Sequence, residues 1–155
     1  MTTVTIRELQ GDDYYSPYAD QEITTRGVVT GVLRRGFFIQ TPDKKWDGKG
    51  SDAVFVYSQD LTASVGYEVE VKGCCVDYLK DENAKPITQI QLKEVNILSR
   101  KKNRVEIVEI DHAFLNKKNT LVAKSLNSLE AMLVKVEAGQ TFIAPTNSYG
   151  DYVLA

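Results

Sequence analysis

The sequence predicts a mainly β protein, with a five-stranded barrel followed by a smaller segment that contains one helix and several strands. Runs rich in β-branched and aromatic residues recur between turn signals along the first two thirds of the chain. Only one stretch, late in the chain, shows convincing helical spacing of apolar residues. With 155 residues, of which 43% are hydrophobic and 26% charged, the chain has the composition of a folded globular protein.

The N-terminal extension precedes the long strands. Residues 4–9 are a short strand candidate, and residues 11–17 are rich in turn-forming residues. We expect this extension to belong to the same unit as the strands that follow.

Five β-rich runs then lie between residues 22 and 98. Gly27 and Gly31 fall inside the first run, where a small barrel needs sharp curvature, and glycine permits such a bend. Five strands is the number found in an OB-type Greek-key barrel, so we predict that fold for residues 1–98. The runs are 22–33, 36–40, 53–57, 68–76 and 87–92, the last continuing towards Leu98.

A basic linker is predicted at residues 99–104. Its four cations are Arg100, Lys101, Lys102 and Arg104. They could contact phosphates in a salt-dependent way, or the segment could be a solvated linker.

Residues 105–155 are predicted to form a helix plus strands, in the manner of an incomplete second OB-like unit. A helix is expected at 120–132, and strands are expected at 105–110, 132–136, 140–144 and 152–154. The edge strands of such an incomplete unit would need a partner to pair with their backbone groups. This partner could be another part of a parent protein or a second copy of the chain, so homo-oligomer contacts through this segment are possible.

The net charge and the cysteine content limit the kinds of function that this chain can have. The net charge is −2, made up of −4 in residues 1–70 and +2 in residues 71–155, so any polyanion site must be a local patch. The two cysteines, Cys74 and Cys75, are adjacent, point to opposite faces of a strand, and receive no chemical role. No apolar run is long enough for a membrane span, and we expect no signal peptide in this chain.

Residues 4–98 resemble the OB-like domain found beside the catalytic domain in bacterial extracellular nucleases of the endonuclease/exonuclease/phosphatase family. The matching pieces are 6–11, 16–17, 25–30, 36–40, 42–43, 51–57, 65–66 and 88–90. Residues 130–136 look like the opening of the segment that follows in those nucleases, although Ala131 stands where the family usually has glycine. The resemblance implies association with DNA or RNA turnover at or outside the cell envelope, next to a nuclease catalytic domain in the same or another chain.

Catalytic machinery is not visible in the sequence. His112 is the only histidine, and we expect it to be a surface or capping residue. No Ser/His/Asp order, phosphate-binding glycine loop or zinc spacing occurs. The metal-dependent chemistry of the resembling nucleases lies in a separate domain. We therefore expect a chain that is not an enzyme and needs no cofactor.

A candidate nucleic-acid-binding face follows from strand alternation. If Phe37 and Ile39 point into the barrel, Phe38 points out, and the same reasoning turns Phe55 and Tyr57 outward. OB barrels bind single strands on this face, stacking bases on aromatic rings and pairing phosphates with cations. The alternatives are that another part of the protein covers these rings, or that the phase is inverted and they are core. The predicted binding residues, for single-stranded or duplex nucleic acid, are Arg26, Arg34, Arg35, Phe38, Gln40, Phe55 and Tyr57.

The loop at residues 43–52 carries three aspartates, Asp43, Asp47 and Asp52, among glycines and lysines. Its spacing is not that of an EF-hand and three lysines oppose a cation, so we expect a long hairpin loop and no metal. Trp46 could touch a ligand or pack over the barrel rim.

From these features we predict a non-catalytic accessory module that binds nucleic acid for a nuclease or a related DNA- or RNA-processing protein. The alternative is a structural or protein-interaction domain that docks or spaces a separate catalytic domain.

Overall fold

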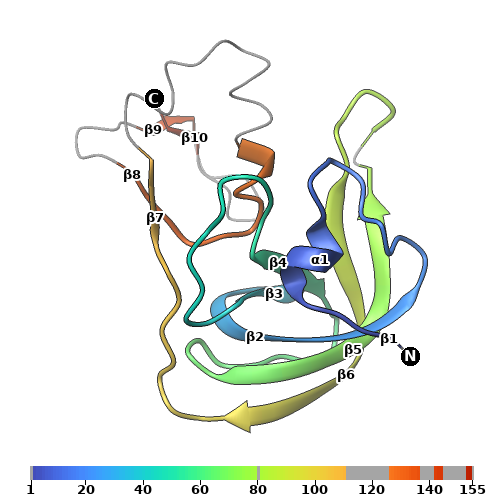
Figure 1. Ribbon diagram of the computed structural model, residues 1–155, viewed down its shortest axis with the longest axis vertical. Helices are drawn as coiled ribbons and strands as arrows, with labels where there is room; N and C mark the ends of the chain where they lie inside the picture. Colours follow the sequence, from blue (N-terminus) through green and yellow to red (C-terminus); the bar gives the residue numbers. More distant parts are fainter. Residues whose placement is uncertain (1, 80, 111–125, 137–141, 145–152, 155) are drawn as a thin grey trace.

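A computed structural model describes residues 2–79, 81–110, 126–136, 142–144 and 153–154, and it is mainly β (Figure 1). Six strands form one mixed sheet, and two further pairs of strands lie in the C-terminal part. The elements are β1 (Thr2–Thr3), α1 (Ile6–Gln10), β2 (Glu22–Leu33), β3 (Gly36–Gln40), β4 (Ala53–Tyr57), β5 (Glu68–Tyr78), β6 (Ile87–Ser99), β7 (Val108–Ile110), β8 (Val134–Val136), β9 (Phe142–Ala144) and β10 (Val153–Leu154).

Five strands of the large sheet pair in a closed ring. The order is β2–β3–β4–β6–β5, and β5 returns to pair with β2. All of these pairs are antiparallel except β4 with β6, which is parallel. β1 adds a short parallel strand beside the start of β2. The five long strands predicted from the sequence are therefore confirmed, with β5 and β6 slightly longer than expected.

The beginning of the chain is a helix and not the predicted strand at residues 4–9. Thr5 caps α1: its Oγ1 accepts from the backbone N–H of Glu8, and the Glu8 carboxylate accepts from the backbone N–H of Thr5. This reciprocal capping box is a helix-start signal that a short apolar run does not reveal. Ile6 and Leu9, three residues apart on one helical face, are fully buried.

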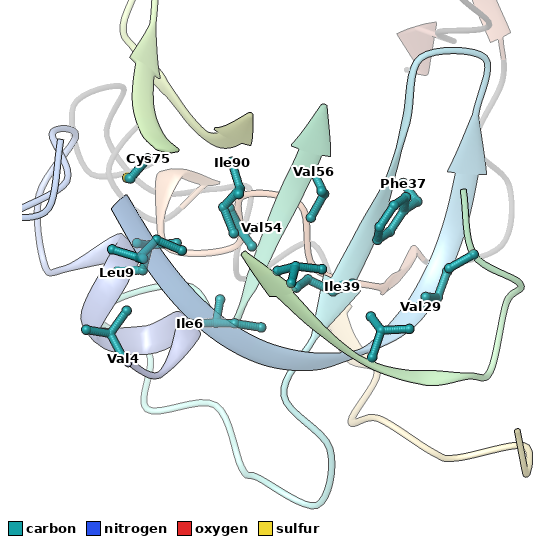
Figure 2. Close-up of a cluster of buried hydrophobic side chains, with 14 residues drawn as sticks. Val4, Ile6, Leu9, Val29, Phe37, Ile39, Val54, Val56, Cys75 and Ile90 are labelled. Carbon is teal, nitrogen blue, oxygen red and sulfur yellow. The ribbon is translucent and has the colours of Figure 1, made fainter. Parts of the chain in front are cut away.

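The main core lies inside the ring of strands and beneath α1 (Figure 2). It includes the side chains predicted to point inward, among them Phe37, Ile39, Val54 and Val56, all with 0% exposure, together with Ile6 and Leu9 of α1. The alternation of residues along each strand thus predicted correctly which side chains of β3 and β4 face the core. One face of these strands is buried, and a buried face strongly determines the register of strand pairing. A slip of one residue would have placed Phe38 and Phe55 inside instead.

The C-terminal segment packs against the outside of this sheet. Val108, Ile110, Leu129 and Met132 form a second apolar cluster with Ala53 of β4, and Trp46 packs against it. β7 and β8 pair in parallel, and β9 and β10 pair antiparallel. These strands fall within four of the predicted segments, 105–110, 132–136, 140–144 and 152–154.

The predicted helix at 120–132 falls only in part on described residues. Leu126 and Asn127 are helical, but residues 128–131 form a turn, in which the backbone N–H of Met132 donates to the carbonyl of Leu129. Ala131 has φ of 62°, a left-handed conformation that ends a helix. Residues 111–125, and with them His112, lie outside the described residues. No helix in the described part of the chain is long and apolar enough to span a bilayer.

Candidate nucleic-acid interface

The aromatic pair Phe38 and Phe55 lies on the outer face of β3 and β4. The two residues are direct cross-strand partners, and their ring centroids are 5.1 Å apart with planes inclined at 52°. Both side chains are half-buried. The inverted phase is therefore excluded, and the rings are partly open to solvent instead of being wholly covered.

Two glycines lie against these rings. A Cβ atom on Gly36 would lie 2.6 Å from Cζ of Phe55 and 2.2 Å from the carbonyl oxygen of Val56, and its φ is 152°, so a side chain at this position would displace the Phe55 ring. A Cβ atom on Gly31 would lie 3.4 Å from Cδ2 of Phe38, which is ordinary van der Waals contact. The position of Phe55 therefore depends on glycine at residue 36.

Tyr57 extends the aromatic surface towards the end of β4. It pairs in register with Gly36 on one side and with Gln91 of β6 on the other. The amide nitrogen of Gln59 donates to its hydroxyl oxygen at 3.0 Å. The ring is half-buried, so this residue presents both an aromatic surface and a polar edge.

Arg34 and Arg35 form the turn between β2 and β3, beside Tyr57. Both are exposed, and the backbone N–H of Ser58 donates to the carbonyl of Arg35 at 3.0 Å. No carboxylate among the described residues forms an ion pair with either guanidinium. The backbone of this turn therefore lies next to the Tyr57 end of the aromatic surface, and the role of the two cations in binding stays a prediction.

Arg26 is separated from that surface. It lies opposite Glu70 of β5, and its Nε donates to the Glu70 carboxylate at 3.2 Å. Along β2 it is five residues from Gly31, the register partner of Phe38, which is about 16 Å of strand. Arg26 was predicted to lie near the rings because it points outward on the same strand. However, β2 pairs with β5 before Val28 and with β3 after it, so Arg26 faces Glu70 of β5 and not the rings of β3 and β4.

Gln40 is buried and does not belong to an open binding face. It is only 1% exposed, and its amide nitrogen donates to the carbonyl of Glu106 at 2.8 Å. Its amide oxygen accepts from the backbone N–H of Leu133 at 2.9 Å. The alternation was correct in turning Gln40 outward, but the C-terminal segment covers this end of β3. Gln40 therefore holds that segment in place.

The loop before β4 serves as a second attachment point for the same segment. The indole N–H of Trp46 lies 3.1 Å from the carbonyl of Gly50 and 3.0 Å from that of Ser128. Its backbone N–H donates to the Glu106 carboxylate at 2.8 Å. Of the two uses expected for Trp46, the structure therefore shows packing at the rim.

Two of the three aspartates of this loop, Asp47 and Asp52, have structural partners. Asp47 accepts from Arg7 Nε at 2.9 Å and from the backbone N–H groups of Lys49 and Gly50. These hydrogen bonds outweigh the effect of its partial burial and lower the pKa of Asp47 to about 2. The buried Asp52 pairs with Lys44. Within the described ranges no group of three metal-ligating side chains is found.

A buried polar network joins the C-terminal segment to the ends of β5 and β6, and sequence reasoning missed it. The Glu130 carboxylate accepts from the backbone N–H of Thr88 at 2.9 Å, and the Thr88 hydroxyl donates to Asp77 at 3.1 Å. Burial, together with the negative charge of Asp77, raises the pKa of Glu130 to about 7 despite the Thr88 hydrogen bond. No sequence pattern links residues this far apart.

The basic linker contributes Arg104 to a hollow of about 410 Å³, which it lines with Asp43, Lys44, Lys45, Val105 and Glu106. Arg100, Lys101, Lys102 and Arg104 are exposed, and Asn103 fixes the linker through its backbone and side-chain N–H groups to the carbonyl of Gly66. Cys74 is half-buried and Cys75 fully buried, and both are free thiols, as expected from strand alternation. Burial raises the pKa of Cys75 to about 11.

Comparison with protein-family models gave no match, and no curated protein is significantly similar to this chain. The resemblance to nuclease-associated domains therefore remains a prediction from short sequence pieces.

Proposed function

We propose that residues 1–98 form an OB-type Greek-key barrel. The closed ring of five strands supports this, as does the parallel pairing of β4 with β6 across a chain that visits β5 in between. The register supports it too. When register partners are followed once around the ring, the path that starts at Leu33 of β2 returns to β2 at a different residue, Glu22. Such a shift in register is expected when the strands of a closed barrel are tilted. The path around the ring runs Leu33, Gly36, Tyr57, Gln91, Cys74 and Glu22.

We propose that the chain is a non-catalytic module that binds single-stranded nucleic acid on β3 and β4. The observation that carries this is the row of partly exposed rings, Phe38, Phe55 and Tyr57, beside Arg34 and Arg35, which form no ion pair with any described residue. Bases can stack on such rings whatever their identity, and arginines can pair with the phosphates. With a net charge of −2, binding would depend on this local patch.

The module is proposed to serve a nuclease or another DNA- or RNA-processing protein. The sequence pieces shared with nuclease-associated domains support this, and the catalytic groups would then lie in a separate domain. Presenting a single strand to that domain is the role that this surface favours.

The test is the binding of labelled single-stranded oligonucleotides, measured by fluorescence anisotropy over a range of salt concentrations. Phe38→Ala and Tyr57→Ala should each weaken binding by about 1 kcal/mol or more, because each removes a stacking surface. Arg34→Ala with Arg35→Ala should lower the salt dependence by about 0.7 for each phosphate contact that is lost. Arg26→Ala is the matched control, since this exposed arginine already pairs with Glu70 away from the rings.

Absence of binding at low salt would exclude this function. So would binding that persists unchanged in Phe38→Ala and Tyr57→Ala, because the rings would then be irrelevant.

A structural or docking role is the second candidate, and one observation favours it. The Ala53 end of the same face is already used to bind a protein segment, through Trp46, Leu129 and Met132. In this alternative the outer face of the barrel spaces or docks a neighbouring domain. Failure to bind oligonucleotides, with normal folding, would leave this role.

A further inference from the structure

The C-terminal segment reaches the barrel through residues 105–110 and 126–136, and hydrogen bonds make up much of this contact. The apolar cluster beneath the segment is small and takes only Ala53 from the described strands of the barrel. The barrel residues that share hydrogen bonds with the segment are Gln40, Trp46, Ser51 and Thr88. A segment held in this way can separate from the barrel without opening the main core.

Glu130 is the attachment of this segment that lies beside a second carboxylate. Its carboxylate accepts from the backbone N–H of Thr88, at 2.9 Å, and the Thr88 hydroxyl donates to Asp77 of β5. Asp77 is the charged group that faces Glu130, whereas β6 and the loop before β4 meet this residue with the neutral groups Thr88 and Ser51. Among the described residues no cation pairs with either carboxylate.

The two carboxylates differ in how well hydrogen bonds stabilise their charge. Asp77 accepts from the backbone N–H of Ser16 with both of its oxygens and from the Thr88 hydroxyl as well. Glu130 accepts a single hydrogen bond from the part of the chain that the structure describes. A carboxylate with fewer donors takes up a proton more easily, so Glu130 is the member of this pair that titrates first as the pH falls.

Ionisation of Glu130 therefore opposes docking of the segment. A second negative charge beside Asp77, without a cation, is unfavourable, and it regains water when the segment separates. In the docked state, burial and the charge of Asp77 raise the pKa of Glu130 to about 7. Docking should be strongest below pH 4.5, weaken up to about pH 7 and stay constant above, with a fall of about 300-fold in the docking constant.

We propose that Glu130 is a pH-sensitive latch: when protonated it keeps the C-terminal segment docked on the barrel, and when ionised it lets the segment separate while the barrel stays folded. This inference goes beyond the proposed function and does not depend on nucleic-acid binding. Separation would uncover Gln40 and Ala53, which lie on the same outer face as Phe38 and Phe55. The latch would thus control how much of that face is open.

Trp46 provides the measurement, because it is the only tryptophan of the chain. It belongs to the loop before β4, and its indole N–H lies 3.0 Å from the Ser128 carbonyl of the segment. When the pH is raised from about 4.5 to about 8, its emission should shift to longer wavelength and acrylamide should quench it more strongly, mostly below about pH 7. The circular dichroism of the β-sheet should stay constant over this range.

Glu130→Gln should abolish the shift, because the amide oxygen can still accept from Thr88 but carries no charge. Glu106→Gln is the matched control. Glu106 is also on the segment and accepts one backbone N–H of the barrel, but from Trp46 and not from Thr88, so this variant should keep the pH response.

Four results would overturn the latch. They are an emission that does not change with pH in the wild type, the same change in Glu130→Gln, loss of the response in Glu106→Gln, and loss of the sheet signal together with the emission change. The last result would mean that the whole barrel unfolds instead of releasing one segment.

Discussion

The outer face of β3 and β4 has two ends, and they differ in what covers them. At one end Gln40 and Ala53 lie beneath the C-terminal segment. At the other end Phe38, Phe55 and Tyr57 are partly exposed. The polar residue is thus more deeply buried than the aromatic residues, which reverses the usual distribution.

This difference shows how to recognise function on a single sheet face. Gln40 is buried at little cost because both of its amide groups are paired with backbone. The aromatic rings form no comparable hydrogen bonds with the C-terminal segment among the described residues, and part of their surface is open to solvent. The predictions below test this contrast, beginning with the largest effect.

Gln40→Ala should destabilise the protein most, by about 3 kcal/mol. It removes a fully buried side chain and leaves the part-buried carbonyl of Glu106 and N–H of Leu133 without their partners, at a combined cost of roughly 3 kcal/mol. Urea unfolding measures the change. A loss below about 1 kcal/mol would show that the C-terminal segment contributes little at this end.

The folding stability should also depend on pH, through Glu130 in the segment that covers the Gln40 end. The folded state binds this proton more tightly than the unfolded state does, so stability should fall as pH rises from 4.5 to about 7. The loss should reach roughly 2–3 kcal/mol and stay constant above that range. Glu130→Gln keeps an acceptor for Thr88 without the charge, so its unfolding free energy should lose this part of the pH dependence. Identical pH profiles for the two proteins would contradict this.

At the aromatic end, Phe38→Ala should cost less folding stability than Gln40→Ala, about 1–2 kcal/mol, because its ring lies at the surface and is partly in solvent. Its effect on oligonucleotide binding should be at least as large as its effect on stability. If Phe38→Ala strongly lowered the folding stability but left oligonucleotide affinity unchanged, Phe38 would be a structural residue and not a binding residue.

The smallest effect is expected for Arg26→Ala. Its ion pair with Glu70 is exposed on the arginine side, where such pairs contribute about 0–1 kcal/mol. Both thermal stability and oligonucleotide affinity should stay close to wild type. A marked loss of affinity would mean that the strand path crosses β2 as well.

The sequence predicted the strands and their inward faces well, because alternation is a local property. It predicted that Phe38, Phe55 and Tyr57 point outward for the same reason. It missed α1, although Thr5 and Glu8 carry a recognisable capping box. That signal was available in the sequence and was outweighed by a short apolar run.

Other features depend on contacts between distant residues and have no local signal. The partners of Gln40 lie at Glu106 and Leu133, and Glu130 meets Thr88. Arg26 was misplaced because strand membership alone does not say which neighbour a residue faces.

The adjacent cysteines provide a built-in reporter of opening in the sheet. Cys74 is partly accessible on the outer side of β5, while the Cys75 sulfur lies in the core, donating to the hydroxyl of Ser16 at 3.3 Å. A thiol reagent should therefore modify the first in the intact protein and the second only when β5 separates from its neighbours. Two labelling rates from consecutive residues would then distinguish surface chemistry from unfolding.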